Sequence, residues 1–215
     1  MRSNFDKELD LLNNQLITMG SLVEDRINGA VVALKNQDKN LAKKIIRGDT
    51  EIDDIERDIE SKCLKLILKQ QPVASDLRLI SSILKMITDL ERIGDHAQDI
   101  SEISLLLSNE KYITDLTFIP QMADTTILMV KQSIDAFLSH DIDLANNVIR
   151  FDDKVDNLFA IVKKQLILLI REDSNNGEQA LNFLMIAKYF ERIGDHAVNL
   201  AEWVVFSITG EHVNN

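Results

Sequence analysis

Residues 91–97 read Glu-Arg-Ile-Gly-Asp-His-Ala, and residues 191–197 repeat the same seven letters. A weaker match without gaps joins residues 33–53 to residues 136–156, with shared Asp, Leu, Ala, Ile and Arg positions. Chance does not plausibly give seven consecutive identities, and an internal match of this kind indicates a repeated structural unit. The chain is therefore a tandem duplication.

Helix is favoured along nearly all of the chain, because only seven glycines and two prolines occur among its 215 residues. Breaks are expected at 36–38 and 70–72 in the first half, and at 139–141 and 173–177 in the second. Each half then holds three long helices, and short connections between long helices make neighbours antiparallel. The sequence predicts an all-α protein of two tandem three-helix bundles with six long helices.

The two halves are expected to meet within residues 108–120, where helical periodicity is interrupted and Pro120 stops or starts a helix. We therefore predict one bundle over residues 1–110 and a second over residues 118–215. The expected helix N-caps are Asp38, Asp141 and either Ser174 or Asn175.

The third helix of the first half carries an apolar seam at spacings of three and four, made of Leu77, Ile80, Leu84 and Ile87. The next positions of this pattern are Glu91 and Gly94, and in the second half the pattern leads to Glu191 and Gly194. A carboxylate on a packed seam without a counter-charge costs on the order of several kcal/mol or stays protonated. The register therefore predicts that both glutamates are neutralised.

Acidic residues also occur in pairs at i, i+4, which places two carboxylates one turn apart on one helix face. The four pairs are Asp49 with Asp53, Glu91 with Asp95, Asp152 with Asp156, and Glu191 with Asp195. Like charges at this spacing repel, so grouping them near a bundle interior is favoured when a multivalent cation neutralises them. We predict that all eight residues ligate metal. In a chain with 35 acidic residues, chance pairs on solvated faces are the alternative.

The ligand chemistry limits the choice of metal. Oxygen-only ligation suits Mg²⁺, Mn²⁺ or iron, bound as single ions or as a multinuclear cluster, and argues against zinc or copper. His96 and His196 lie off the face that carries the acidic pairs, so they are not assigned to the site. Arg92 and Arg192 are either counter-charges or ordinary surface residues.

Gly94 and Gly194 sit in mid-helix, where glycine costs roughly 1 kcal/mol relative to alanine. We expect them either to let the third helix approach its neighbour closely or to leave room for metal. Gly48 is replaced by Phe151 in the second half. We therefore expect the two metal sites to differ in affinity or nuclearity.

Composition also narrows the class of protein. A formal charge of −11 without a basic stripe argues against nucleic acid as a partner. Cys63 is the only cysteine, which excludes an internal disulfide and fits a reducing compartment. No signal peptide opens the chain, and no apolar run approaches the roughly 20 residues that span a bilayer. We expect a cytoplasmic protein without direct membrane insertion.

The two Glu-Arg-Ile-Gly-Asp-His-Ala motifs, together with Asp-x-x-x-Asp on each second helix, resemble the PhoU family of bacterial phosphate transport. The resemblance covers nearly the whole chain and implies iron or other metal clusters at the four acidic motifs. It further implies a homodimer that restrains phosphate uptake and phosphate-starvation signalling. The implied partners are the ATPase subunit of a phosphate ABC transporter and a phosphate sensor histidine kinase.

Other functional classes fit the sequence less well. Di-iron carboxylate enzymes use Glu-x-x-His pairs, but the residues three before the four histidines are Ile93, Phe137, Ile193 and Thr209. No phosphate loop, nucleophile elbow or zinc motif is present, so we predict that the chain is not an enzyme. A helical scaffold without a metal-dependent role, or an accessory protein of another phosphate carrier, stays an alternative.

Overall fold

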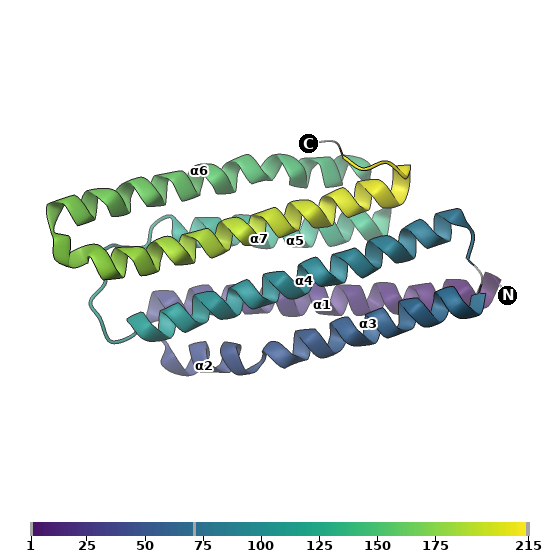
Figure 1. Ribbon diagram of the computed structural model, residues 1–215, viewed down its shortest axis with the longest axis horizontal. Helices are drawn as coiled ribbons and strands as arrows, with labels where there is room; N and C mark the ends of the chain where they lie inside the picture. The colour runs from purple at the N-terminus through teal and green to yellow at the C-terminus, as the bar shows by residue number, and fades with distance from the viewer. Residues whose placement is uncertain (1, 71, 214–215) are drawn as a thin grey trace.

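The structure is a computed structural model that describes residues 2–70 and 72–213, without the side chains of residues 2–4, 49 and 70. Helices run side by side along the long axis of the molecule (Figure 1). Over the described residues they are α1 (Arg2–Asn36), α2 (Lys39–Arg47), α3 (Asp49–Gln70), α4 (Ala74–Leu107), α5 (Ile119–Ser139), α6 (Ile142–Glu172), a 3-10 helix (Ser174–Asn176) and α7 (Gly177–Thr209).

The helices form two three-helix bundles, as predicted. The first bundle consists of α1, α2 with α3, and α4, and the second consists of α5, α6 and α7. The second helix of the first half is interrupted at Gly48, whose N–H donates to the carbonyl of Ile45 at 3.0 Å and closes the last turn of α2. Counting α2 and α3 as one interrupted helix, the prediction of six long helices is confirmed.

The duplication extends to the backbone conformation of the first connection in each half. Gln37 and His140 follow α1 and α5 with φ of 53° and 54°, in the left-handed region that often ends a helix. The next residue then caps the following helix, as predicted. Asp38 Oδ1 accepts from the backbone of Asn40 and Leu41 at 2.9 and 3.0 Å, and Asp141 Oδ1 accepts from Leu144 at 2.9 Å.

One predicted cap is wrong. Neither Ser174 nor Asn175 caps α7, because both lie in the 3-10 helix that precedes it. Asp173 caps that short helix by accepting from the Asn175 backbone at 2.9 Å, and α7 begins after Asn176 without a side-chain cap.

The segment between the halves is tied to both of them. Tyr112 donates its hydroxyl to the carbonyl of Leu34 on α1 at 2.8 Å. The buried Gln179 of α7 accepts from the Ile113 backbone at 2.7 Å and donates to Glu110 at 2.8 Å. The predicted limits 1–110 and 118–215 stay a prediction, because a single apolar core runs through both halves.

α4 and α7 lie at the centre of this core. α4 packs against α1 and α3 of its own bundle and also against α7, which in turn packs against α5 and α6. Each central helix is therefore apolar on more than one face. The buried side chains of α4 include Ile83, Met86, Leu90 and Ile93, and those of α7 include Phe183, Ile186, Phe190 and Ile193.

This double packing corrects the predicted seam. Leu77 is 43% exposed and Leu84 is half-buried, whereas Ile80 and Ile87 are buried as expected. Glu91 lies next to the buried Leu90 and is itself half-buried, so it flanks the core and does not replace a core leucine. A single heptad seam cannot describe a helix that buries two faces.

The repeated glycines bring the second and third helices of each half close together, as predicted. A Cβ at Gly94 would lie 2.9 Å from Ile52 Cδ1 on α3, and a Cβ at Gly194 would lie 3.4 Å from Val155 Cγ1 on α6. The contact is tighter in the first half. Each glycine lies next to the aspartate of the motif and about one turn from its glutamate, so this approach positions the candidate site.

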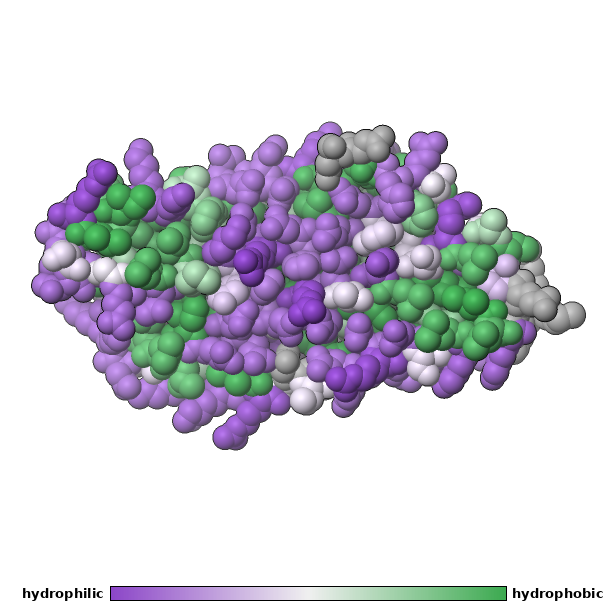
Figure 2. Space-filling model, in the orientation of Figure 1, coloured by the Kyte–Doolittle hydropathy of each residue, from purple (hydrophilic) through white to green (hydrophobic). Residues whose placement is uncertain are grey.

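The surface over α4 and α7 is mixed in polarity. Figure 2 shows hydrophilic residues over the middle of this face and hydrophobic patches nearer its two ends. Exposed apolar side chains occur near the start and end of α4, at Leu77 and Leu106, and near the start of α7, at Leu181. None of the helices in the described part of the chain is long and apolar enough to cross a membrane.

The capping geometry gives a stability prediction. Replacing Asp141→Ala should lower the free energy of unfolding by about 1 kcal/mol, because the backbone N–H of Leu144 loses its acceptor. Urea unfolding followed by circular dichroism measures this. Asp135→Ala, at an exposed position near the end of α5, is the control and should not lower stability. Equal loss in both variants would contradict the capping role.

Candidate metal centres

The acidic residues of the first half lie where α3 packs against α4. Asp53 on α3 and Glu91 and Asp95 on α4 are all half-buried. Burial raises the pKa of Glu91 above its ordinary value, and the charges of Asp95, Glu56 and Asp53 raise it further, while Arg92 lowers it. The carboxylates of the two helices therefore form one electrostatic cluster.

Arginines partly neutralise this first cluster. Arg92 Nη1 donates to Asp95 Oδ2 at 2.9 Å, and its Nε lies 3.4 Å from Glu91 Oε2. Arg57 Nη2 lies 3.6 Å from Asp53 Oδ2. Of the two roles left open for Arg92, the structure confirms that of a counter-charge. Arg192 differs, since its charge lowers the pKa of His96 and of Tyr189.

The sequence did not identify Glu56 as part of the first cluster. Burial raises the pKa of Glu56, and the neighbouring charges of Glu60 and Asp53 add to the effect. Glu56 lies three residues after Asp53 on α3, a spacing that places both side chains on the same helix face, and this spacing could have identified it. It was missed because the repeat alignment places Phe159 at this position in the second half.

The second cluster lies where α6 packs against α7, and it is more strongly perturbed. Burial raises the pKa of Asp152 to about 6, with further contributions from the charges of Asp156, Asp195, Asp153 and Glu191. Burial followed by the charge of Glu191 also raises the pKa of Asp195. The structure thus brings all four predicted residues of this half together, although Asp156 and Asp195 are exposed.

Lysine replaces arginine as the counter-charge of the second cluster. Lys188 pairs with Glu191 and lowers the pKa of Asp195. The first half has Thr88 at the matching position, so this ion pair has no counterpart there. The two clusters differ in their counter-charges as well as in the tightness of the glycine contact.

One carboxylate oxygen in each cluster is buried without a hydrogen-bond partner. These atoms are Asp53 Oδ1 and Asp152 Oδ1, which belong to the Asp-x-x-x-Asp pair of the first and of the second half, at its second and first position respectively. Asp152 Oδ1 would lie 3.6 Å from a Cβ at Gly194, so it faces the glycine of the motif. An unsatisfied buried carboxylate oxygen is costly, and a bound cation is one partner that removes the cost.

The clusters fit oxygen ligation but do not form a complete ligand shell. Among the described residues, no group of three or more Asp, Glu, His or Cys side chains is arranged to hold a metal ion. The side chain of Asp49 lies outside the described residues. Metal ligation by the eight predicted residues therefore stays a prediction.

The two histidines of the repeated motif lie between the halves. Their ring centroids are 5.6 Å apart, where α4 packs against α7. His196 Nδ1 lies 2.8 Å from Asp89 Oδ1 on α4, and the ring of His96 lies 5.4 Å from that of Tyr189 on α7. The motif therefore directs its histidines toward the other repeat and its carboxylates toward the second helix of its own bundle.

Comparison with known proteins adds a family match. The model of the PhoU domain matches residues 16–104 and again residues 119–204. The phosphate-specific transport system accessory protein PhoU homolog of Clostridium acetobutylicum is 40% identical over 214 residues, covering 99% of this chain and 98% of the relative. The PhoU protein of Escherichia coli K12 is 37% identical over 207 residues, covering 96% and 86%.

Solved structures agree with the sequence comparison. The crystal structure of PhoU from Pseudomonas aeruginosa has a TM-score of 0.92 at 36% identity, covering 96% of this chain and 100% of that one. The phosphate transport system regulatory protein PhoU from Streptococcus pneumoniae has a TM-score of 0.90 at 30% identity, covering 98% and 100%.

The raised pKa of Asp152 predicts a pH-dependent loss of stability in metal-free protein. Its value of about 6 in the folded state exceeds the ordinary 3.8, so ionisation destabilises the fold as pH rises from 4 through 6. Asp152→Asn should raise the free energy of unfolding at pH 7 by about 1 kcal/mol, less than the full pKa shift implies because solvent screens this partly exposed group. The gain should vanish below pH 4.

Urea titrations in EDTA from pH 4 to pH 8 test this prediction. Asp124→Asn, an exposed carboxylate on α5, is the matched control and should follow the wild-type pH dependence. A stability difference between Asp152→Asn and the wild type that does not grow from pH 4 to pH 8, or the same gain in the control, would show that Asp152 carries no such repulsion.

Proposed function

The chain belongs to the PhoU family, and from this membership we propose that it is a metal-binding cytoplasmic regulator of phosphate uptake and phosphate-starvation signalling. Its similar relatives are named as accessory proteins of the phosphate-specific transport system. The proposal gives the same role to this chain, which matches them over nearly its whole length.

The duplicated acidic clusters carry the metal part of the proposal. Each half places carboxylates of two helices together, and each leaves one buried oxygen unpartnered, at Asp53 and at Asp152. Mutual repulsion raises the pKa of Glu91 in the first half and of Asp195 in the second, after the larger effect of burial. A multivalent cation would relieve both the repulsion and the missing interaction.

The donor set favours hard or borderline cations such as Mg²⁺, Mn²⁺ and iron, because it consists of carboxylate oxygens. The proposed ligands in the first half are Asp49, Asp53, Glu91 and Asp95. Those in the second half are Asp152, Asp156, Glu191 and Asp195. When bound, the metal would supply positive charge that neutralises carboxylates on both helices, which would tie α3 to α4 and α6 to α7.

Regulation in this proposal acts through protein contacts and not through catalysis. The proposed partners are the ATPase subunit of a phosphate ABC transporter and a phosphate sensor histidine kinase, and the proposed assembly is a homodimer. The overall charge of −11 suits basic surfaces on such partners. Restraint of phosphate import at high phosphate is the expected outcome.

The metal claim has a direct test with a matched control. Wild-type protein exchanged into Mg²⁺, Mn²⁺ or Fe buffers should retain stoichiometric metal by elemental analysis. The double variant Glu91→Gln, Glu191→Gln should lose most of it. The control Glu8→Gln, Glu172→Gln makes the same charge change at exposed positions and should retain it. Metal at background level in the wild type would contradict metal binding and would favour the alternative of a helical scaffold without a metal-dependent role.

The regulatory claim is tested separately in the native host. Cells that lack the chain should take up labelled phosphate faster at high phosphate and should express phosphate-starvation genes that are normally silent. Wild-type protein should restore both, and the control double variant should do the same. Unchanged uptake and expression in the deletion strain would rule out the regulatory role whatever the metal content, and would point to another phosphate carrier or another process.

A further inference from the structure

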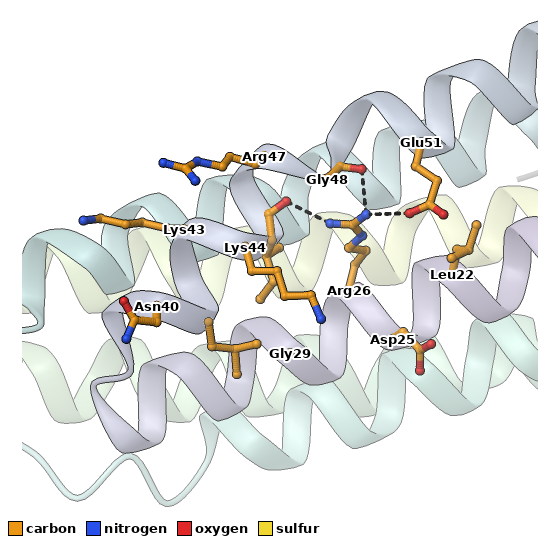
Figure 3. Close-up of a pocket in the computed structure, with 12 residues that line it drawn as sticks. Leu22, Asp25, Arg26, Gly29, Asn40, Lys43, Lys44, Arg47, Gly48 and Glu51 are labelled. Carbon is orange, nitrogen blue, oxygen red and sulfur yellow. Dashed lines mark hydrogen bonds and ion pairs between the residues drawn. The ribbon is translucent and has the colours of Figure 1, made fainter.

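A groove of about 750 Å³ lies between α1 and α2 in the first half, and none of the residues that line it is one of the eight proposed metal ligands. Figure 3 shows Lys44 reaching from α2 toward the α1 residues Arg26 and Asp25, with Lys43 and Arg47 pointing together in another direction at the rim. This volume lies within the range of roughly 300–1,000 Å³ that is typical of small-molecule sites.

The interruption of the helix at Gly48 shapes the groove. Arg26 donates from Nη1 to the carbonyl of Ile45 at 2.9 Å, and from Nη2 to the carbonyl of Gly48 at 2.6 Å (Figure 3). Its Nη2 also lies 3.2 Å from Glu51. A Cβ at position 48 would overlap the Arg26 guanidinium, so glycine is required for this contact. Arg26 therefore satisfies the end of α2 and has a fixed position in the groove wall.

The charge of α2 is opposite to that of the protein. This helix carries Lys39, Lys43, Lys44 and Arg47 and no acidic residue, in a chain of formal charge −11. Among the described residues, Lys43, Lys44 and Arg47 make no ion pair. Since Arg26 already pairs with Glu51, Asp25 is the one remaining carboxylate among the lining residues that can offset these three cations. The rim has an excess of positive charge.

The second half lacks this arrangement, although it retains the acidic cluster. The repeat alignment replaces Lys43 and Lys44 by Asn146 and Asn147, and Gly48 by Phe151. The smaller hollow there has a volume of about 390 Å³ and is lined by Gln132, Asn147, Arg150 and Phe151. The basic groove is therefore not needed to build the repeated fold, and it belongs to the first half.

The lining indicates the class of ligand. The cations extend along α2, with Lys43 and Arg47 one turn apart, so a ligand with several negative charges in a row engages more of them than a single anion does. Leu22, Leu41 and Ile45 supply apolar surface beside the cations. We propose that the α1–α2 groove binds a small molecule with two or more linked phosphoryl groups, as an inorganic oligophosphate or as part of a nucleotide.

Isothermal titration calorimetry with tripolyphosphate and with ATP tests this proposal. EDTA is present throughout, so that metal bound at the acidic clusters cannot bridge to the phosphates. We expect one-site binding with a Kd below about 1 mM, weakened by added salt because the contacts are between exposed charges. Similar affinity for both ligands would show that the phosphate chain is what the groove recognises. Tighter binding of ATP would show that the apolar surface of the groove also contacts the nucleoside. Both results support the proposal.

Variants locate the site. Lys44→Gln, Arg47→Gln should weaken binding at least tenfold, and both side chains are exposed, so folding is retained. The control Lys163→Gln, Lys164→Gln makes the same charge change at exposed positions of α6 and should bind within twofold of the wild type. Absence of binding of both ligands up to 1 mM would overturn the proposal, as would unchanged affinity in the groove variant.

Discussion

α4 and α7 pack against each other through the middle of the molecule, and every other α-helix of the described chain contacts one of them. The repeated motif lies on these two helices, and its side chains point in three directions. Ile93 and Ala97 enter the core, Glu91 and Asp95 face α3, and His96 faces α7. One short sequence therefore contributes to the core, to the acidic cluster and to the contact between repeats.

The acidic clusters are the places where packing and electrostatics oppose each other. The motif glycines allow a close helix approach, which brings carboxylates of neighbouring helices together and removes part of their water. Burial and like charge both disfavour the ionised form, so the fold accommodates these side chains at a cost in stability. Such sites are a common exception to the agreement between local sequence preference and fold, and they are usually functional.

Features set by local sequence could be predicted. The duplication, the four connections between long helices of the same half and the caps at Asp38 and Asp141 depend on residues close together in the chain, whereas the interruption at Gly48 was not predicted. The heptad pattern wrongly placed Leu77 and Glu91 in the core, because the sequence of α4 does not show how many other helices pack around it. The contribution of Glu56 to the cluster depends on α4, across the helix interface. The sequence shows that Phe151 replaces Gly48 in the second half. It does not show that Gly48 makes room for Arg26, because that contact joins two different helices.

The single core shared by both halves also bears on how the chain reaches this structure during synthesis. α4 is complete about a hundred residues before α7, and domains made on the ribosome generally fold from the N-terminus. Until α7 emerges, the surface of α4 that will meet it has no partner and remains in water. The first half is therefore fully translated before its core is complete. Its packing is completed only when α7, from the second repeat, covers the exposed surface of α4.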